Sequence, residues 1–273
     1  MGYFRRKLGE LGLSSFDIIF LRCFVAAVLF FVFILITNPS SLKLRFADIW
    51  CFIGSGVCSL LFFTACYFQA MTVMSLALSA ILLYTAPFFV ILLSSVLFKE
   101  KITKRMLAAL LISFAGICLV SGIFSEDSRI STVGILYGLG SGFGYALYTI
   151  FSKLALKRNY KSTTISFYSM LFAAIGAALI WGTDKSVNIL FSSYENLIFI
   201  VVAGIATGFV PYLLYTFGLT KVEGGRASLL ASIEPVVATI VGIIAFNEKM
   251  SIISISGMIL VLSGIAIISL GEK

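Results

Sequence analysis

Long apolar segments separated by short polar connections follow one another along the whole chain. A helix needs roughly 20 mostly apolar residues to cross a bilayer. Nine segments approach or exceed that length, at 15–37, 48–73, 75–97, 104–123, 133–156, 163–182, 196–218, 225–246 and 251–270. Backbone groups in lipid must be paired internally, and these segments lack the alternation of barrel strands. The pattern therefore predicts an all-α integral membrane protein.

The composition agrees with this interpretation. Hydrophobic residues make up 60% and charged residues 12% of the 273 positions, and the mean hydropathy is +1.10, whereas soluble domains carry about 25% charged residues. The net charge of +8 comes from basic residues in short connections, which indicates membrane orientation and not nucleic-acid binding. Histidine is absent, and the five cysteines lie in apolar segments without metal-ligand spacing, so we expect no metal, cofactor or disulfide.

The second half of the chain repeats the first when the sequence is shifted by 148 residues. Segment starts at 163, 196, 225 and 251 then fall on 15, 48, 77 and 103. Rare residues also fall into register: Tyr67 on Tyr215, Pro87 on Pro235, and Phe98, Glu100 and Lys101 on Phe246, Glu248 and Lys249. We therefore expect a duplication, with a first repeat at 1–124 and a second at 132–270.

Five helices per repeat give a ten-helix scheme, of which the chain holds nine. The segment at 133–156 has only its last turn in the first repeat, since Phe151–Leu156 align with Tyr3–Leu8. We expect the true start to lie upstream of Met1, where roughly 15 or more further residues would complete a first helix. A genuine nine-helix variant is the alternative.

An odd number of helices per repeat places the two repeats in opposite orientations across the membrane. With the N-terminus of the ten-helix scheme in the cytoplasm, the basic residues expected inside are Lys43, Arg45, Lys99, Lys101, Lys104, Arg105, Lys153, Lys157, Arg158, Lys161, Lys221, Arg226 and Lys273. Fewer are expected outside: Arg5, Arg6, Lys7, Arg129, Lys185 and Lys249. This bias fits the positive-inside rule and predicts an inverted-repeat bundle in the cell (plasma) membrane, which in a bacterium is the inner membrane.

Several runs, in order, resemble one transporter family. They are Leu11–Arg22, then Thr85-Ala86-Pro87 through Phe98-Lys99-Glu100-Lys101, and the second copy, Ile233-Glu234-Pro235 through Phe246-Asn247-Glu248-Lys249. Glycine-rich endings follow around Gly116 and Gly264. Across essentially its whole length the chain resembles the drug/metabolite transporter superfamily, in particular its EamA-type ten-helix exporters, with most of the first helix missing. The resemblance implies a central cavity lined by helices three, four, six, eight and nine of the ten-helix scheme.

Two charged residues lie inside apolar segments, where charge is costly and usually functional. Arg22 is a candidate for gating or for an ion pair, and the alternatives are a side chain that snorkels to the outer interface or pairs with Asp17. Glu234, the deepest acid, is expected to be buried and is a candidate for proton coupling or amine binding. The alternative is a structural acid that ties down a broken helix.

Polar and aromatic residues at helical spacing complete the candidate site. Tyrosine hydroxyls in hydrocarbon need partners, so tyrosines are candidates to line a polar cavity, whereas small residues at this spacing are first of all packing faces. The candidates for the substrate cavity are Tyr67, Tyr84, Tyr145, Tyr148, Tyr212, Tyr215, Ser228 and Ser232. Pro87, Pro211 and Pro235 are expected to kink their helices.

The function expected from these features is a secondary transporter that exports small organic metabolites, either amino acids or drug-like compounds, by alternating access. Its expected partners are a small-molecule substrate and the lipid bilayer, and the oligomeric state and coupling ion stay open. The alternative is a truncated, transport-inactive membrane subunit with a structural or regulatory role. An intramembrane enzyme is not expected, because the chain lacks histidine and has no close pair of acids at membrane depth.

Overall fold

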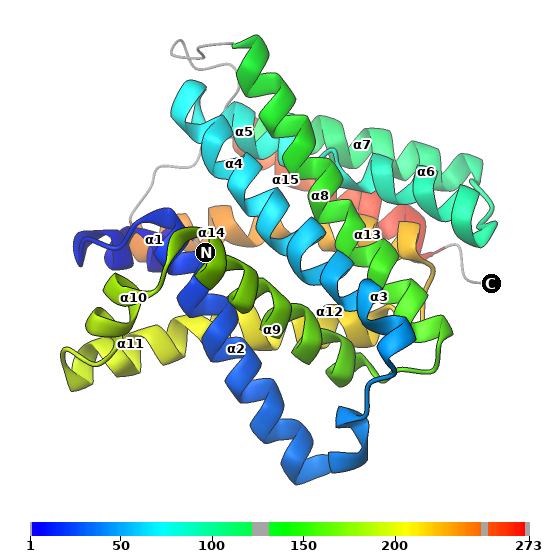
Figure 1. Cartoon of the computed structure of the whole chain (residues 1–273). Helices are drawn as coiled ribbons and strands as arrows, with labels where there is room; N and C mark the ends of the chain where they lie inside the picture. The colour runs from blue at the N-terminus through cyan, green and yellow to red at the C-terminus, as the bar shows by residue number, and fades with distance from the viewer. Residues whose placement is uncertain (1, 122–130, 247–250, 271–273) are drawn as a thin grey trace. The chain divides into compact units, whose positions relative to one another are not determined.

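The computed structural model describes residues 2–121, 131–246 and 251–270, and all regular elements in these ranges are helical (Figure 1). Eight helical stretches within them are long and apolar enough to cross a membrane. The ninth expected segment is α7 (Lys104–Val120), which has 17 residues. The first expected span, 15–37, coincides with α2 (Ser15–Thr37). The predicted all-α membrane architecture is confirmed.

The chain packs into two compact units, each assembled from two separate stretches. Unit 1 comprises Met1–Ala65 and Leu147–Lys221. Besides α2, it contains α1 (Gly2–Glu10), the 3₁₀ turns η1 (Pro39–Leu42) and η2 (Phe46–Asp48), α3 (Ile49–Ile53), the π-helix η3 (Gly54–Leu61), α9 (Ser162–Trp181), α10 (Asp184–Leu190), α11 (Tyr194–Gly204), the π-helix η4 (Ile205–Phe209) and α12 (Val210–Gly218).

Unit 2 comprises Cys66–Ala146 and Val222–Lys273. Besides α7, it contains α5 (Leu76–Leu83), α6 (Ala86–Phe98), α13 (Gly224–Ala231), α14 (Glu234–Phe246) and α15 (Ile252–Ser269). Two helices, α4 (Phe62–Val73) and α8 (Thr132–Lys157), begin in one unit and end in the other. Each unit therefore mixes segments from both expected repeats.

The offset of 148 residues recurs in the element bounds. The helices α5 and α6, at 76–83 and 86–98, correspond to α13 and α14, at 224–231 and 234–246. Both breaks are tightened turns, in which Thr85 N donates to Leu82 O at 3.2 Å and Ile233 N donates to Leu230 O at 3.3 Å. Two long apolar stretches of the chain are thus each divided into half-helices at the same repeat position.

Helices at equivalent repeat positions also pack in pairs within each unit (Figure 1). In unit 1, α2 packs along α9, and in unit 2, α7 packs along α15. The second contact depends on glycine, because a Cβ on Gly264 would lie 2.8 Å from the backbone oxygen of Ala109. Small residues let the two backbones approach closely, as is common between membrane helices.

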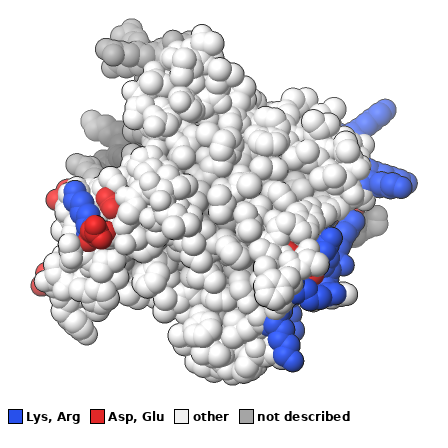
Figure 2. All heavy atoms as spheres, viewed as in Figure 1, with Lys and Arg blue, Asp and Glu red and all other residues white. Residues whose placement is uncertain are grey.

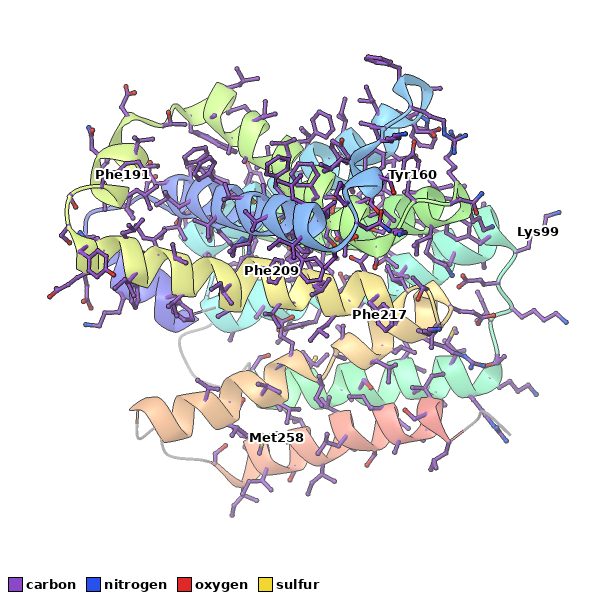
Figure 3. All side chains as sticks on the ribbon, turned by 90° about the horizontal axis from the view of Figure 1, so that it is seen from below. Lys99, Tyr160, Phe191, Phe209, Phe217 and Met258 are labelled. Carbon is purple, nitrogen blue, oxygen red and sulfur yellow. The ribbon has the colours of Figure 1, made fainter. Side chains whose placement is uncertain are left out.

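In unit 1, α2 is also held against the π-helix η4. Phe209 packs with Phe30 at a ring separation of 4.5 Å and with Phe33 at 6.0 Å (Figure 3). A Cβ on Gly204 would lie 2.4 Å from Cγ1 of Val25, so glycine is needed for this approach. Gly204 thus belongs to a packing face, whereas Gly218 of α12 has open space beside it.

Much of the exterior is apolar. Figure 2 shows a face that is mostly white, with charged side chains restricted to small areas of it. Large apolar side chains such as Ile36, Leu179 and Ile252 are about four-fifths exposed. Exposed apolar side chains in this number are unfavourable in water and favourable against lipid tails.

Candidate functional site

Three of the predicted tyrosines meet in unit 1. Tyr148 of α8 lies edge-on to Tyr212 of α12, with ring centroids 5.0 Å apart, and 6.2 Å from the ring of Tyr215. Tyr148 is 4% exposed, whereas Tyr212 and Tyr215 are half-buried. The structure thus brings these candidates from two sequence-distant helices into one aromatic cluster.

Two of the three hydroxyls of this cluster form hydrogen bonds with threonine hydroxyls. Tyr148 OH lies 2.9 Å from Thr216 Oγ1, and Tyr215 OH lies 2.7 Å from Thr149 Oγ1. Ser166 Oγ donates to Thr216 Oγ1 at 3.1 Å and so joins α9 to the network. The sequence did not predict the hydrogen-bond partners Thr149, Ser166 and Thr216. Their role depends on their buried position next to the tyrosines, which only the structure shows.

A second group of candidates forms in unit 2, beside the break between α5 and α6. Tyr84 follows the last residue of α5 and interacts electrostatically with Glu234 of α14 and with Tyr67 of α4. It also packs against Ile81 and Val236. The break between α5 and α6 therefore lies close to Glu234, which follows the equivalent break between α13 and α14.

The expectation that Glu234 is buried is wrong. Its side chain is exposed in the structure, and it is the first residue of α14. The break after α13 explains this position, because the carboxylate sits at a helix N-terminus and not inside a continuous helix. The positive end of the helix dipole favours a negative charge there.

The remaining cavity candidates in unit 2 differ in their surroundings. Ser228 and Ser232, on and directly after α13, are each 2% exposed and belong to the packed interior. Tyr145 of α8 is half-buried and packs against a cluster that contains Ala86 and Val90 of α6. Of these three, Tyr145 alone retains an accessible face.

Each of the three prolines expected to kink a helix lies at the second position of one. Pro87 follows the first residue of α6 and Pro235 follows the first residue of α14, in both cases just after a break, and the oxygen of Pro235 accepts from Thr239 at 2.9 Å. Pro211 differs, because α12 follows η4 without a break, and the helix continues through this proline. Proline lacks a backbone donor and fits the first turn of a helix.

Arg22 lies well inside α2, and 6% of it is exposed. Such burial does not fit a side chain that snorkels to the interface. A small hollow of about 10 Å³ beside it is lined by residues such as Ile200 and Thr207, and a Cβ on Gly208 would lie 3.4 Å from Arg22 Cγ. Asp17 caps α2 by accepting from Ser14 N at 2.8 Å, and it also accepts from Ser186 Oγ at 2.7 Å.

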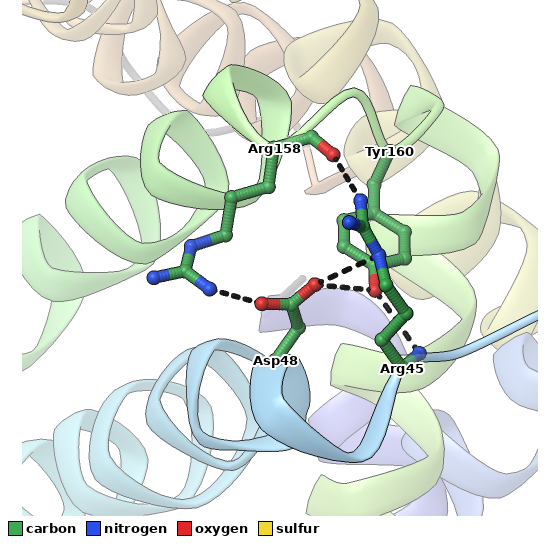
Figure 4. A network of polar contacts seen from close by, with 4 residues as sticks. All are labelled: Arg45, Asp48, Arg158 and Tyr160. Atoms are coloured by element: carbon green, nitrogen blue, oxygen red, sulfur yellow. Dashed lines mark hydrogen bonds and ion pairs between the residues drawn. The ribbon is translucent and has the colours of Figure 1, made fainter.

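A polar network in unit 1 was not predicted (Figure 4). Asp48, at the start of α3, pairs with Arg158, accepts from Tyr160 OH at 2.8 Å, and lies 3.4 Å from Arg45 Nε. Arg45 also donates from Nη2 to the oxygen of Arg158 at 3.1 Å. Arg45 and Asp48 lie more than 100 positions before Arg158 and Tyr160 in the sequence, so no local pattern reveals their meeting. The network ties the loop before α3 to the turn between α8 and α9.

Comparisons with known proteins agree with this architecture. The EamA-like transporter family matches residues 2–122 and again 132–270. A crystal structure of another protein shares the fold with a TM-score of 0.77 and 18% identity, over 94% of this chain and 88% of that one.

Relatives named as transporters align over most of the chain. An uncharacterized transporter of Archaeoglobus fulgidus is 31% identical over 203 residues, which are 74% of this chain and 70% of that protein. The uncharacterized transporter YetK of Bacillus subtilis is 26% identical over 262 residues, 93% of this chain and 78% of that protein. The chain therefore belongs to the EamA-like transporter family and is a multi-span membrane transporter.

Proposed function

We propose that this protein is a secondary transporter that exports small organic metabolites, amino acids or drug-like compounds, across the plasma membrane by alternating access. The observation that carries the proposal is the pair of matched breaks, between α5 and α6 and between α13 and α14. Secondary transporters commonly build substrate sites at discontinuous helices, where helix ends and unpaired backbone groups meet the cargo. Breaks at equivalent positions of two repeats fit that plan.

Glu234 is our candidate for the group that binds a substrate amine or carries a coupled proton. It lies ten residues after the start of α13, which is about 15 Å along a helix axis and near the middle of a hydrocarbon core of roughly 30 Å. An exposed acid at such depth is costly against lipid and favourable in a watered pathway. Tyr84, which interacts electrostatically with Glu234 and with Tyr67, supplies an aromatic ring and a hydroxyl for an organic cargo, and Tyr67 is a second candidate for this role.

We also propose the domain organisation, the partners, the gating residue and the location that were expected from the sequence. The domain organisation is an inverted pair of repeats, 1–124 and 132–270, and the partners are a small-molecule substrate and the lipid bilayer. Arg22 is assigned to gating, through ion pairing inside unit 1, where it is buried beside Gly208 of η4. A bacterial inner membrane is the expected location.

Counterflow in proteoliposomes tests the function. Liposomes with the purified chain are loaded with an unlabelled panel of amino acids and small amphipathic drugs, one compound at a time, and labelled compound is supplied outside. We expect transient accumulation of label for at least one organic compound, and none in protein-free liposomes. Absence of counterflow across the panel, with the chain shown to be folded, would contradict the proposal.

A further inference from the structure

Unit 1 contains a hollow of about 460 Å³ where the ends of α2, α8, α9 and α12 meet. That volume lies within the range of roughly 300–1,000 Å³ typical of small-ligand pockets. Its apolar lining residues are Ile34, Leu156 and Phe217, the last of which is labelled in Figure 3. Its polar lining includes Asn38, Ser41, Tyr160, Lys161, Ser162 and Thr163. The lining includes a cation and several hydroxyls but no acid.

The free donors of this hollow are suited to an anion. Lys161 is exposed, and none of the ion pairs between described residues includes it. It is also the N-cap of α9, and its side chain makes no capping hydrogen bond to the first turn of that helix. Ser41 Oγ is shielded from solvent and has no hydrogen-bond partner among the described residues. Helix N-termini, hydroxyls and lysine together form a favourable environment for a phosphate group.

The wall of the hollow is fixed by contacts that leave these donors free. Thr164 Oγ1 donates to the oxygen of Ser41 at 2.9 Å, and Tyr168 OH donates to the oxygen of Leu42 at 2.6 Å, so η1 is held against α9. The network around Asp48 holds the rest of the loop, and Arg45 and Arg158 pair with the carboxylate of Asp48. These hydrogen bonds and ion pairs therefore fix the segments of unit 1 that form the hollow.

We infer that this hollow binds the phosphate headgroup of an anionic lipid. A lining that combines a lysine and several hydroxyls with apolar side chains matches a molecule whose phosphate is attached to hydrocarbon, and basic pockets between membrane helices bind such headgroups. The hollow lies at the ends of spanning helices, where headgroups are found, and the predicted orientation assigns it to the cytoplasmic leaflet. This site is separate from the proposed transport site and does not depend on it.

Native mass spectrometry of the full chain in neutral detergent tests the inference. Phosphatidylglycerol is titrated against wild type, Lys161→Gln and Lys101→Gln, the last being an exposed lysine outside the hollow. One tightly held lipid is expected on wild type. Removing one interfacial charge should weaken its binding about fivefold in Lys161→Gln and leave it unchanged in Lys101→Gln.

Two further arms make the result decisive. Thr163→Val, which removes a lining hydroxyl without a charge change, should also weaken lipid binding, whereas phosphatidylcholine and inorganic phosphate should not compete. If Lys161→Gln and Lys101→Gln lose the same lipid affinity, the lipid responds to the general surface charge, and the proposed site is wrong. Displacement of the lipid by millimolar inorganic phosphate would overturn the lipid as occupant.

Discussion

Gly116 of α7 and Gly257 of α15 lie in reciprocal backbone contact. A Cβ on Gly116 would come within 2.6 Å of the oxygen of Gly257, and a Cβ on Gly257 within 2.7 Å of the oxygen of Gly116. Backbone atoms cannot move aside as a flexible side chain can, so the two helices would have to separate. This pair of glycines therefore sets the spacing of the two repeat-terminal helices in unit 2.

Replacing Gly116 by alanine should destabilise the protein. Overpacking of this kind typically costs about 1–3 kcal/mol, which we expect as a lower midpoint of thermal unfolding in detergent, followed by tryptophan fluorescence. Gly218→Ala is the matched control, because nothing lies within 4 Å of its Cβ position. A midpoint for Gly116→Ala equal to that of Gly218→Ala would refute the close contact.

Much of the fold is predictable because lipid imposes simple rules on the sequence. Apolar length alone places α2 at its observed bounds, and proline in register places the breaks before Pro87 and Pro235. The π-helices η3 and η4 were not predicted, since one extra residue in a turn leaves the apolar pattern unchanged. The composition of the compact units, which mix both repeats, depends on packing that a hydropathy pattern does not encode.

The candidate site was predicted only in part. The need of tyrosine hydroxyls for partners was foreseeable, but the identity of those partners, such as Thr216 for Tyr148, depends on which helices pack together. The position of Glu234 in an apolar segment indicated burial, whereas the break turned it into an exposed N-terminal residue. The surroundings of each side chain depend on which helices pack together, so they cannot be derived from the spacing of residues in the sequence.

The hydrogen bond between Thr149 and Tyr215 should contribute to stability. Tyr215→Phe and Thr149→Val each remove it, and a typical hydrogen bond contributes about 0.5–1.5 kcal/mol. In a double-mutant cycle of urea unfolding in detergent, we expect a coupling energy in that range, with the double variant less destabilised than the sum of the single ones. Strict additivity would show that the two hydroxyls do not interact.

The network around Asp48 predicts a rescue by charge exchange. Asp48→Arg places a third cation beside Arg45 and Arg158 and should lower the midpoint of thermal unfolding clearly. Adding Arg158→Asp restores an opposite pair at the same place, so part of the midpoint should return. If the double variant is no more stable than Asp48→Arg alone, the ion pair does not hold the loop.

Glu234→Gln should reduce transport while leaving the fold intact, because the exposed carboxylate is not part of the packed interior. Loss of one charged hydrogen bond to a substrate amine or proton corresponds to roughly a 10-fold to 100-fold lower rate. Glu195→Gln, an acid in the first turn of α11, should keep the wild-type counterflow rate. A wild-type rate and pH dependence in Glu234→Gln would remove this residue from the mechanism.

The most direct test of export is uptake by sealed inside-out vesicles from cells that produce the chain, because their outer face is the former cytoplasmic side. For the compound that shows counterflow, the account predicts that these vesicles accumulate it faster than vesicles without the chain, and that Glu234→Gln vesicles lose most of the difference. Equal uptake by vesicles with and without the chain would contradict the assignment as an exporter.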